Sequence, residues 1–384
     1  MNITFKLPKR IDADNAPTVQ KFIEDTIADK GVPAKTLDVL MNASDMEYIS
    51  SAGLRVLLSV KKKTASVSIM NASEAICEIF EVTGFDEFIN IEKKMEEISI
   101  EGLELIAVGT TAKIYRLGED KILKAYYERI PYEDVVKEQN MIKKALAQGI
   151  STMIPYGIVQ VGNGFGSVYE LLKAKTILRC IKDDPENEDM YLEKFVDFVK
   201  SNHGIQMTGS SVKSIKKTFY DRIDQLSENG FYSVDEAMTA RQVIYSIPDK
   251  DTFVHGDCHI GNVMYEEKTK ELYFIDMMSL SKGNPIFDIF GMAWMRLAPQ
   301  VLDNDNLEST VGLSNDALTR IWRKIISLYF ETTDKKIIDE LDRQYTMLEC
   351  LNLSMAETFV PGLFTKESLE WLKAEGMKAA ELEF

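Results

Sequence analysis

One segment of this chain, VHGDCHIGNVMYEEKTKELYFIDMM (Val254–Met278), constrains its fold more than any other feature. It holds two of the three histidines, and it places His255, Asp257 and Asn262 within eight positions. Asp276 follows inside a second apolar run, and apolar runs of this length between polar residues are typical of buried strands. Polar side chains gathered between two strands indicate a tight turn, a metal site or a centre for phosphoryl transfer.

The composition is that of a globular protein with room for more than one hydrophobic core. The chain has 384 residues, of which 45% are hydrophobic and 28% are charged. No apolar run reaches the roughly 18 residues that a membrane helix requires, and the N-terminus has no apolar signal core. We therefore expect a cytoplasmic protein with no membrane partner.

The net charge of −16 argues against nucleic acid as a main partner, because the phosphate backbone is itself anionic. An acidic protein would suit a cationic substrate, although the demands of solubility explain the charge equally well. The four cysteines lie far apart without a C-x-x-C pair, which disfavours both a disulfide framework and a zinc cluster. Cys258 lies in the segment quoted above, but no neighbouring base marks it as a nucleophile.

The first hundred residues alternate short apolar strands with amphipathic helices. The expected strands include ITFKLP, TLDVLMN, SVSIMN and EFINI, and the expected helices are Asp14–Asp29, Ser51–Lys63 and Ser73–Gly84. This alternation predicts a small α/β layer domain. The charged stretch Glu92–Leu103 marks its boundary.

Three segments of this region, RIDADNAPTVQKFIEDTI, LDVLMNASDMEYISSAGLRVLL and NASEAICEIFEVTGFDEFINI, resemble the STAS domain of anti-sigma-factor antagonists. The resemblance covers roughly residues 3–92 and implies a regulatory or docking role towards a protein partner. It places Ser51 of YISSAGL at the phosphorylatable position, with Ser50 where most members have an aspartate. A hydroxyl at a helix N-terminus lies among backbone N–H groups that stabilise a phosphate, and helix capping is the alternative role.

The next region, ELIAVGTTAKIYRLGEDKILKAYY, predicts a β-meander followed by a helix. Lys124 lies in the apolar part of the last strand, where a lysine is costly to bury unless an anion meets it. Glu138 lies in the middle of the helix. A strand lysine paired with a helix glutamate is how kinases hold the α- and β-phosphates of ATP. Lys113, Lys121 and Glu133 remain alternatives.

His255, Asp257 and Asn262 have the spacing H-x-D-x-x-x-x-N of a kinase catalytic loop. In that interpretation Asp257 accepts or orients the proton of the attacking hydroxyl. Asn262 and Asp276 supply oxygen ligands to Mg²⁺, which prefers few hard protein ligands and borrows phosphate oxygens. A zinc site at His255 and His259 would need a helix, and the neighbouring glycines disfavour one.

These pieces together resemble the aminoglycoside phosphotransferase and choline kinase superfamily, a branch of the protein-kinase-like fold. The match runs over about residues 103–300, and HGDCHIGNVM is its most specific part. The resemblance implies ATP and Mg²⁺ as cofactors and a small-molecule hydroxyl as acceptor. It also implies positions for nucleotide binding and for support of the catalytic loop: Gly109, Thr110, Thr111, Glu170 and Leu172 for the nucleotide, and His255 and Asp288 for support.

The fold class that we expect is α/β and α+β, a STAS-like α/β layer domain followed by a two-lobed kinase-like domain. The predicted boundaries are a STAS-like domain at 1–98, an N-lobe at 99–175 and a C-lobe with a helical acceptor-binding region at 176–384. Aromatic and acidic residues of those helices are candidates for binding a cation.

The predicted function is transfer of a phosphoryl group from ATP to a hydroxyl of a small molecule. Between Asp276 and Asp288 there is no long activation loop, which favours a small acceptor over a protein. Two alternatives remain. In the first, the kinase-like domain phosphorylates Ser51 or a partner protein. In the second, it senses nucleotide without catalysis.

Overall fold

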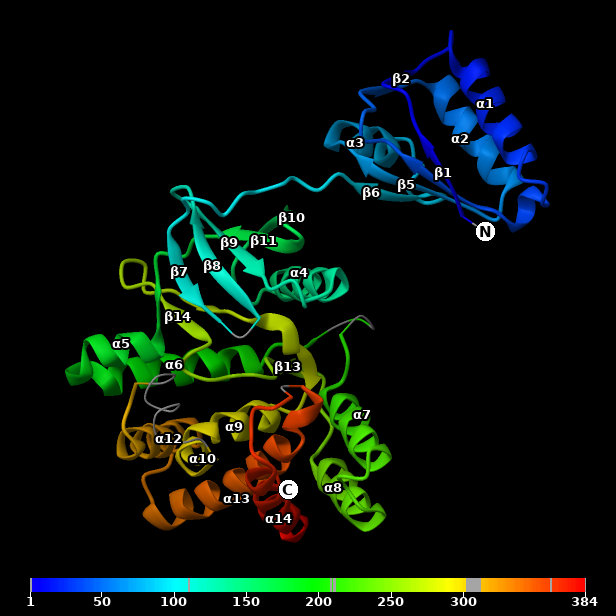
Figure 1. Ribbon diagram of the computed structural model, residues 1–384. Helices are drawn as coiled ribbons and strands as arrows, with labels where there is room; N and C mark the ends of the chain where they lie inside the picture. Colours follow the sequence, from blue (N-terminus) through cyan, green and yellow to red (C-terminus); the bar gives the residue numbers. More distant parts are fainter. Residues whose placement is uncertain are drawn as a thin grey trace. The chain divides into compact units, whose positions relative to one another are not determined.

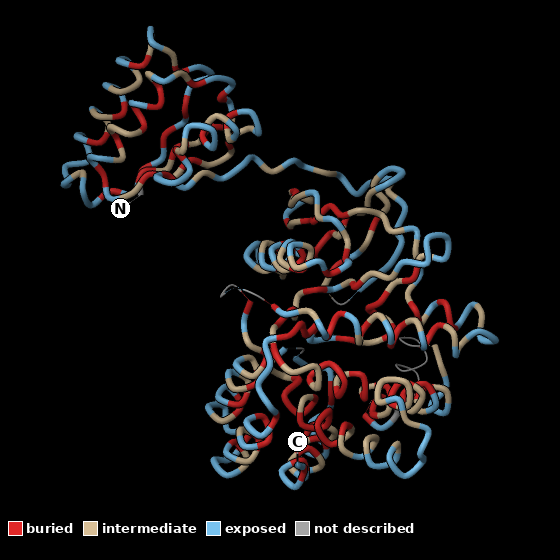
Figure 2. The backbone as a smooth tube through the Cα atoms, turned by 180° about the vertical axis from the view of Figure 1, so that it is seen from behind, coloured by how far each residue is buried: buried red, intermediate tan, exposed pale blue. Residues whose placement is uncertain are grey.

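This computed structural model describes most of the chain, namely residues 2–109, 111–207, 209, 212–301, 312–359 and 361–383. The chain divides into two compact units. The first comprises Met1–Ile100 and Ile158–Asn163, and the second comprises Glu101–Gly157 and Gly164–Phe384. Buried residues gather in the interior of each unit (Figure 2), so each has its own hydrophobic core.

The first unit is a parallel sheet covered by helices (Figure 1). Its four strands have the order β1-β3-β5-β6, and each neighbouring pair is parallel. Two short strands, β2 and β4, form a further parallel pair. The elements are β1 (Asn2–Lys6), β2 (Arg10–Ile11), α1 (Ala16–Ala28), β3 (Asp38–Asn42), β4 (Tyr48–Ile49), α2 (Ser51–Lys63), β5 (Ser66–Ala72), α3 (Glu74–Val82) and β6 (Asn90–Lys93).

Gly53 allows helix α2 to approach strands β2 and β4 closely. A Cβ atom at this position would lie 2.7 Å from Cγ1 of Ile49 and 2.8 Å from Cγ2 of Ile11. Those distances are shorter than van der Waals contact, so any larger residue would push the helix away from the strands. The close packing of α2 against β2 and β4 therefore requires glycine at position 53.

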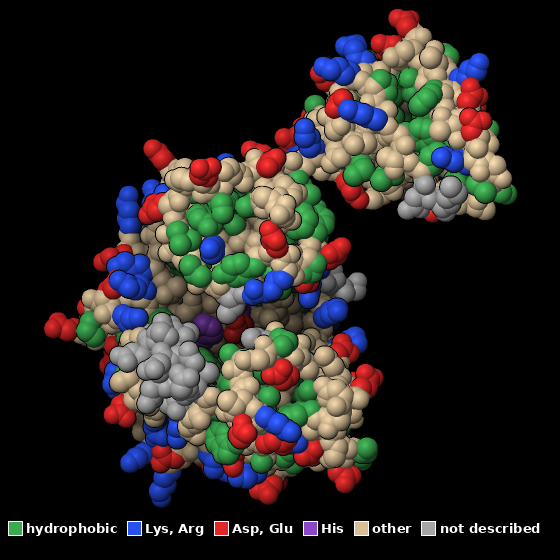
Figure 3. Space-filling view, viewed as in Figure 1, with side chains coloured by type: hydrophobic (Ala, Val, Ile, Leu, Met, Phe, Trp, Pro, Cys, Tyr) green, Lys and Arg blue, Asp and Glu red, His purple; other side chains and the backbone are tan. Residues whose placement is uncertain are grey.

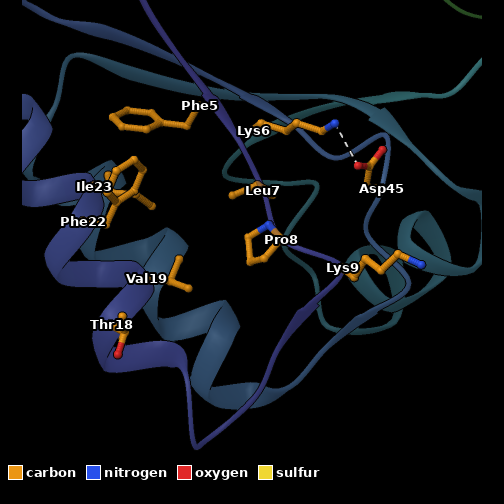
Figure 4. Close-up of a pocket in the computed structure, with 10 residues that line it drawn as sticks. All are labelled: Phe5, Lys6, Leu7, Pro8, Lys9, Thr18, Val19, Phe22, Ile23 and Asp45. Carbon is orange, nitrogen blue, oxygen red and sulfur yellow. Dashed lines mark ion pairs between the residues drawn. The ribbon is translucent and has the colours of Figure 1, made fainter.

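A groove of about 530 Å³ lies along β1 and α1 in this unit (Figure 4). Its lining is mainly apolar, and the ring of Phe22 stands 61% exposed beside it. Lys6 and Lys9 at its rim already form ion pairs with Asp45 and Glu47. The groove therefore offers apolar surface and no unpaired lysine.

A second sheet has five strands in the order β10-β11-β9-β8-β7, and all of it except the part of β10 from Ile158 onward belongs to the second unit. Helix α4 packs against β11, beside the sheet (Figure 1). The pairs β7–β8, β8–β9 and β9–β11 are antiparallel, as the predicted meander requires. The elements of this lobe are β7 (Leu105–Val108), β8 (Ala112–Leu117), β9 (Lys121–Tyr126), α4 (Tyr132–Ala147), β10 (Pro155–Val161) and β11 (Gly164–Glu170).

The C-terminal lobe of the second unit is mainly helical and carries two small sheets, β12-β14-β15 and β13-β16. Its strands are β12 (Lys175–Thr176), β13 (Thr252–Val254), β14 (Val263–Tyr265), β15 (Leu272–Phe274) and β16 (Ser281–Gly283). Its α-helices are α5 (Ile177–Asp183), α6 (Glu188–His203), α7 (Ile215–Glu228), α8 (Val234–Ser246), α9 (Ile286–Met292), α10 (Trp294–Val301), α12 (Asn315–Tyr329), α13 (Lys335–Ser354) and α14 (Lys366–Met377). The 3-10 helices used below are η3 (Met277–Ser279) and η4 (Ala356–Thr358).

Strands β13 and β14 flank the catalytic-loop motif, and β15 ends just before Asp276. The core behind them contains Phe253 and Phe274, both 0% exposed. These apolar strands therefore hold the polar loops at the edge of a rigid interior. Among the helices that the structure describes, none combines the length and the apolar character of a membrane span.

Candidate functional site

Lys124 and Glu138 form a buried ion pair in the N-terminal lobe. The distance from Lys124 Nζ to Glu138 Oε1 is 2.6 Å, and the side chains are 14% and 2% exposed. Strand β9 supplies the lysine and helix α4 the glutamate. The predicted pairing of these two residues is thus present, and neither Lys121 nor Glu133 takes part in it.

Glu138 has further partners that the sequence did not indicate. The hydroxyl of Tyr126 donates to Oε2 at 3.0 Å, and that of Tyr169 to Oε1 at 3.4 Å. Burial raises the pKa of both phenols, and the charge of Glu138 raises them further. Both tyrosines therefore stay protonated and fix the carboxylate as donors. In the sequence, both tyrosines lie in apolar strands, as ordinary core tyrosines do. Nothing in that pattern indicates that they bind Glu138.

The catalytic-loop motif is anchored by Asp288, which is 1% exposed. Its Oδ2 accepts the backbone N–H of His255 at 2.7 Å, and its Oδ1 accepts that of Gly256 at 2.7 Å. Gly256 has a φ of +83°, and a Cβ there would lie 2.5 Å from the carbonyl oxygen of Ser279. Asp288 thus fixes a turn that needs glycine.

His203 completes the anchor, and sequence reasoning missed it. Its Nε2 lies 3.0 Å from Asp288 Oδ2, and its Nδ1 lies 2.8 Å from the hydroxyl of Tyr329. It ends α6, 85 residues before Asp288. A lone histidine near the end of an amphipathic helix carries no signal of such a role, so only the packing identifies it.

His255 orients the loop from within. Its Nδ1 accepts the N–H of Asp257 at 3.3 Å, so Nε2 carries the proton and donates to the carbonyl of Ile275 at 3.0 Å. The ring is 0% exposed. This hydrogen bond ties the motif to the strand end that precedes Asp276.

Asp257 and Asn262 are hydrogen-bonded to one another within the loop, with Asn262 buried and Asp257 exposed. The Asn262 amide nitrogen donates to the Asp257 carboxylate at 3.0 Å and to its carbonyl oxygen at 2.9 Å. In the part of the chain that the structure describes, no donor binds the Asn262 amide oxygen Oδ1. Asp257 is 55% exposed, so its carboxylate is open to a ligand.

Asp276 adopts a left-handed backbone conformation, with φ and ψ both 60°. Non-glycine residues seldom do so, and such strain gathers at functional sites. Its exposed carboxylate has no hydrogen-bond or ion-pair partner among the described residues. The next element, η3, packs against α4, which carries Glu138. The two lobes of this unit therefore meet beside Asp276.

The other positions predicted to bind the nucleotide include a turn of the N-terminal lobe. Gly109 donates its N–H to Ala112 and accepts from the hydroxyl of Tyr127 through its carbonyl oxygen. Thr111 follows in the same turn, whereas Thr110 lies outside the described residues.

The predicted hinge follows β11. The N–H groups of Glu170 and Leu171 donate to Ile154 and Asp120, at 3.0 and 2.8 Å. That of Leu172 makes no hydrogen bond within the described ranges. Leu172 is therefore the position of this predicted hinge with a backbone donor left for a ligand.

A hollow separates the two lobes of the second unit, and a histidine and an acidic side chain are visible inside it (Figure 3). No group of three or more His, Cys, Asp or Glu side chains arranged for a metal ion was found among the described residues, so the zinc alternative lacks further ligands. Burial raises the pKa of the Cys258 thiol well above its ordinary value, which disfavours a nucleophilic role.

Ser51 is the first residue of α2 and is exposed. Ser50 is the N-cap, and its hydroxyl accepts the N–H of Gly53 at 3.4 Å. The capping role thus belongs to Ser50, which leaves the Ser51 hydroxyl at the helix start.

Family comparisons cover both units. The model of the phosphotransferase enzyme family matches residues 102–310, and that of the STAS domain matches residues 2–98. An anti-sigma-B factor antagonist from Bacillus subtilis (strain 168) is 28% identical over 99 residues, which are 25% of this chain and 85% of that protein.

Solved structures to which the chain is similar include an ADP-bound aminoglycoside phosphotransferase, APH(2'')-Ib. It is 15% identical and has a TM-score of 0.46, with 79% of this chain and 98% of that chain covered. An ethanolamine kinase from Plasmodium vivax is 14% identical with a TM-score of 0.45, over 73% of this chain and 82% of that one.

Both resemblances predicted from the sequence are confirmed, and so is the fold class. The match to the model of the phosphotransferase enzyme family, over residues 102–310, spans more than half of the chain. The chain therefore belongs to the phosphotransferase enzyme family and carries a STAS domain at its N-terminus.

Proposed function

We propose that the second unit transfers the γ-phosphoryl group of ATP to a hydroxyl of a small molecule. The observation that carries this proposal is the buried Lys124–Glu138 pair, with its 2.6 Å contact. A lysine held in this way presents its remaining N–H donors to an anion. Burial makes any charge without a counterion costly in free energy. Phosphates of a nucleotide are the anions that such a pair binds in kinases.

The catalytic loop supplies the acceptor side of the reaction. The acceptor oxygen attacks the γ-phosphorus, the bond from that phosphorus to the β–γ bridging oxygen breaks, and ADP leaves. Asp257 takes or orients the hydroxyl proton, for which its exposed carboxylate is placed on a turn fixed by Asp288. Asn262 holds that carboxylate through its amide nitrogen.

Mg²⁺ fits the donor set of this loop. Two oxygen-bearing groups stand without a donor among the described residues, the amide oxygen Oδ1 of Asn262 and the carboxylate of Asp276. Mg²⁺ takes few protein oxygens and completes its shell with water and phosphate. When bound, it would neutralise charge on the phosphates. Among the described residues, no partner binds the hydroxyl of Thr111 or the backbone N–H of Leu172, which makes these two groups the proposed contacts to the nucleotide.

Asp257→Asn tests the acceptor side. We expect it to lower kcat for acceptor phosphorylation by about a hundredfold or more, because it removes the proton acceptor without changing size. The assay measures ADP release with a panel of hydroxylated metabolites and aminoglycosides. Asp251→Asn is the matched control, since the Asp251 side chain is exposed and forms an ion pair with Lys282. Equal loss in both variants, or no wild-type turnover with any acceptor, argues against the proposal.

Lys124→Met tests the nucleotide side. It is expected to raise the KM for ATP, whereas Lys121→Met on the same strand should leave it unchanged, because Lys121 lies over the ring of Tyr156. An unchanged KM for ATP in Lys124→Met would contradict a role of Lys124 in binding the nucleotide.

The exposed Ser51 hydroxyl supports a second candidate function, in which the acceptor is this serine or its counterpart in a partner protein. The backbone N–H groups at the start of α2 would stabilise the resulting phosphate. The STAS domain would then be the regulatory or docking part of the chain. Intact mass after incubation with ATP and Mg²⁺ tests this: one added phosphate in the wild type, none in Ser51→Ala, and no change from the wild type in Ser59→Ala. An unchanged intact mass of the wild-type chain would contradict autophosphorylation.

A further inference from the structure

Two tyrosines of the N-terminal lobe converge on Glu138, and no step of the proposed function uses them. Tyr126 follows Lys124 by two positions on β9, so both side chains lie on one face of the sheet. Tyr169 of β11 pairs with Ile122, which lies two positions before Lys124. Residues that pair directly across two strands point to the same face. The register of β9 and β11 therefore brings both phenols to the face that carries Lys124.

The two phenols bind different oxygens of the Glu138 carboxylate. The hydroxyl of Tyr126 donates to Oε2 at 3.0 Å, and that of Tyr169 donates to Oε1 at 3.4 Å. All three side chains are buried, so little water competes for these hydrogen bonds. The Tyr126 oxygen also lies 3.5 Å from Ser167 Oγ. Because the carboxylate is nearer and charged, the single phenol proton of Tyr126 is shared with Glu138.

These hydrogen bonds determine how many donors Lys124 keeps for a ligand. Its Nζ donates to Oε1 of Glu138 at 2.6 Å, whereas Oε2 binds the Tyr126 hydroxyl. Within the described ranges, Oε1 of Glu138 is the one hydrogen-bond acceptor of the ammonium group. An ammonium group has three N–H donors, so two remain for a ligand. Without the Tyr126 hydroxyl, Oε2 would be open to a second N–H of the lysine.

The ring of Tyr126 makes a separate contact with the lysine. Nζ of Lys124 lies 5.3 Å from the centroid of that ring, which is within the range of a cation–π interaction. A phenylalanine at position 126 would keep the ring and remove the hydroxyl. The effect of the hydrogen bond to Glu138 can therefore be measured apart from the effect of the ring.

We propose that Tyr126 and Tyr169 are positioning residues for nucleotide binding: through Glu138 they hold Lys124 with two N–H donors left for phosphate before the nucleotide arrives. The inference rests on the proposed function and adds two residues to its nucleotide side. Neither phenol contacts the phosphates in this role. The entropy of ordering the ion pair is lost on folding rather than on binding, and such preorganisation raises affinity.

Calorimetric titration of the full chain with a non-hydrolysable ATP analogue and Mg²⁺ tests the inference. Tyr126→Phe should weaken binding of the analogue by about tenfold, as expected for one hydrogen bond to a charged group. Tyr169→Phe should cause a smaller loss, because its hydrogen bond is longer. Tyr115→Phe on β8 is the matched control, since Tyr115 is buried in the same sheet and its hydroxyl has no hydrogen-bond partner among the described residues. Wild-type affinity in Tyr126→Phe, or an equal loss in Tyr115→Phe, overturns the inference.

A double-mutant cycle shows whether the Tyr126 hydroxyl acts through Glu138. Glu138→Ala removes the acceptor of this hydrogen bond, so adding Tyr126→Phe to that variant should cause no further loss of affinity for the analogue. A hydroxyl with a merely structural role would give additive losses, and additive losses contradict the inference. Thermal unfolding checks that each variant is folded.

Hydrogen exchange of the chain without nucleotide gives a readout that does not depend on Glu138→Ala being folded. In Tyr126→Phe the amides of α4 should exchange faster than in the wild type, and the ATP analogue should restore part of their protection. Helix α12 is the internal reference, and its exchange should not change. Equal exchange of α4 in the wild type and in Tyr126→Phe would show that the hydroxyl does not hold Glu138 in place.

Phosphoryl transfer separates the two proposals. With an acceptor that is phosphorylated, Tyr126→Phe should raise the KM for ATP and leave kcat nearly unchanged, because the hydroxyl acts on binding. Transfer with an unchanged KM for ATP in Tyr126→Phe keeps the kinase proposal and contradicts the positioning role. Loss of nucleotide affinity that depends on Glu138, without transfer to any acceptor, keeps the positioning role and contradicts the kinase proposal. No binding of the analogue to the wild type contradicts both.

Discussion

Two buried glutamates of the second unit differ in how their charge is compensated. Glu138 pairs with Lys124 and accepts from two tyrosines, whereas the Asn352 amide is the one hydrogen-bond partner of the Glu349 side chain among the described residues. Desolvation penalises both carboxylates, but within the described part of the chain only Glu138 has a cation in direct contact. Loss of Lys124 should therefore destabilise the chain, whereas substitution of Glu349 should change how stability depends on pH.

Lys124→Met should lower the free energy of unfolding by about 3 kcal/mol, because it leaves the Glu138 charge buried without its cation. The double variant Lys124→Met/Glu138→Gln should recover part of that loss, since it removes the stranded charge. Urea unfolding of the two single variants and the double variant measures the coupling. Additive effects would show that the pair contributes no direct interaction.

Glu349→Gln should change how stability depends on pH. The folded-state pKa of Glu349 lies above 4.5, so the folded chain binds more protons than the unfolded chain at intermediate pH. Stability from this group is present below pH 4.5 and is lost as the pH rises through the folded-state pKa. Relative to the variant, the wild type should therefore lose free energy of unfolding as the pH rises above 4.5 and through the folded-state pKa.

Glu340→Gln on the same helix is the control for that measurement. A hydrogen bond with Arg343 lowers the pKa of the Glu340 carboxyl, so its contribution is lost as the pH falls rather than as it rises. Parallel pH profiles for the wild type and Glu349→Gln would contradict the assignment of a raised pKa to Glu349.

At the scale of elements, α13 and α14 form the C-terminal helix pair of the second unit. Gly376 of α14 lies directly against α13: a Cβ atom there would be 2.5 Å from the backbone nitrogen and Cα of Leu351. Backbone atoms cannot move aside as a side chain can, so the close approach depends on glycine. Because α13 also carries Glu349 and Asn352, this contact helps to position them.

Gly376→Ala should lower the free energy of unfolding of the second unit by about 1–3 kcal/mol through overpacking. Gly291→Ala is the matched control within α9, because a Cβ there would meet no atom within 4 Å and alanine favours the helix. Thermal unfolding followed by circular dichroism compares them. A Gly376→Ala variant as stable as Gly291→Ala would show that the helices can separate without cost.

At the scale of the whole molecule, the chain contains two units with separate hydrophobic cores. Residues that share one hydrophobic core unfold together, so two separate cores predict two unfolding transitions. A ligand that binds one folded unit stabilises that unit by mass action, by about 2.7 kcal/mol at a hundred times its Kd.

Calorimetry of the full chain should therefore show two transitions, of which only one moves to higher temperature with ATP analogue and Mg²⁺. Two variants identify them: Gly53→Ala should lower the transition of the first unit, and Gly376→Ala that of the second. A single transition, or an equal shift of both with nucleotide, would contradict independent unfolding of the two units.

Much of the fold was predictable because its signals are local. The helix expected at Asp14–Asp29 is α1 at Ala16–Ala28, and the one expected at Ser51–Lys63 is α2 with those bounds. Amphipathic periodicity and capping residues act within a few positions of the chain, so the sequence displays them directly. The predicted domain boundaries at 98 and 175 stay predictions.

The candidate site was predictable where its residues share one loop or one strand–helix connection. His255, Asp257 and Asn262 lie on a single turn, and Lys124 lies 14 residues from Glu138 across one connection. The short path between such residues leaves the backbone few ways to separate them.

The amino-acid sequence by itself determined the alternation of the first unit, the spacing of the catalytic loop and the two families, because each is written in residues close together in the chain. Only the tertiary structure decided that His203 joins Asp288, and that Arg222 reaches Asn352 from 130 residues away. Those contacts arise where helices that are distant in the sequence pack together, so no local pattern indicates them. Burial then sets the free-energy cost of the charged groups at those contacts.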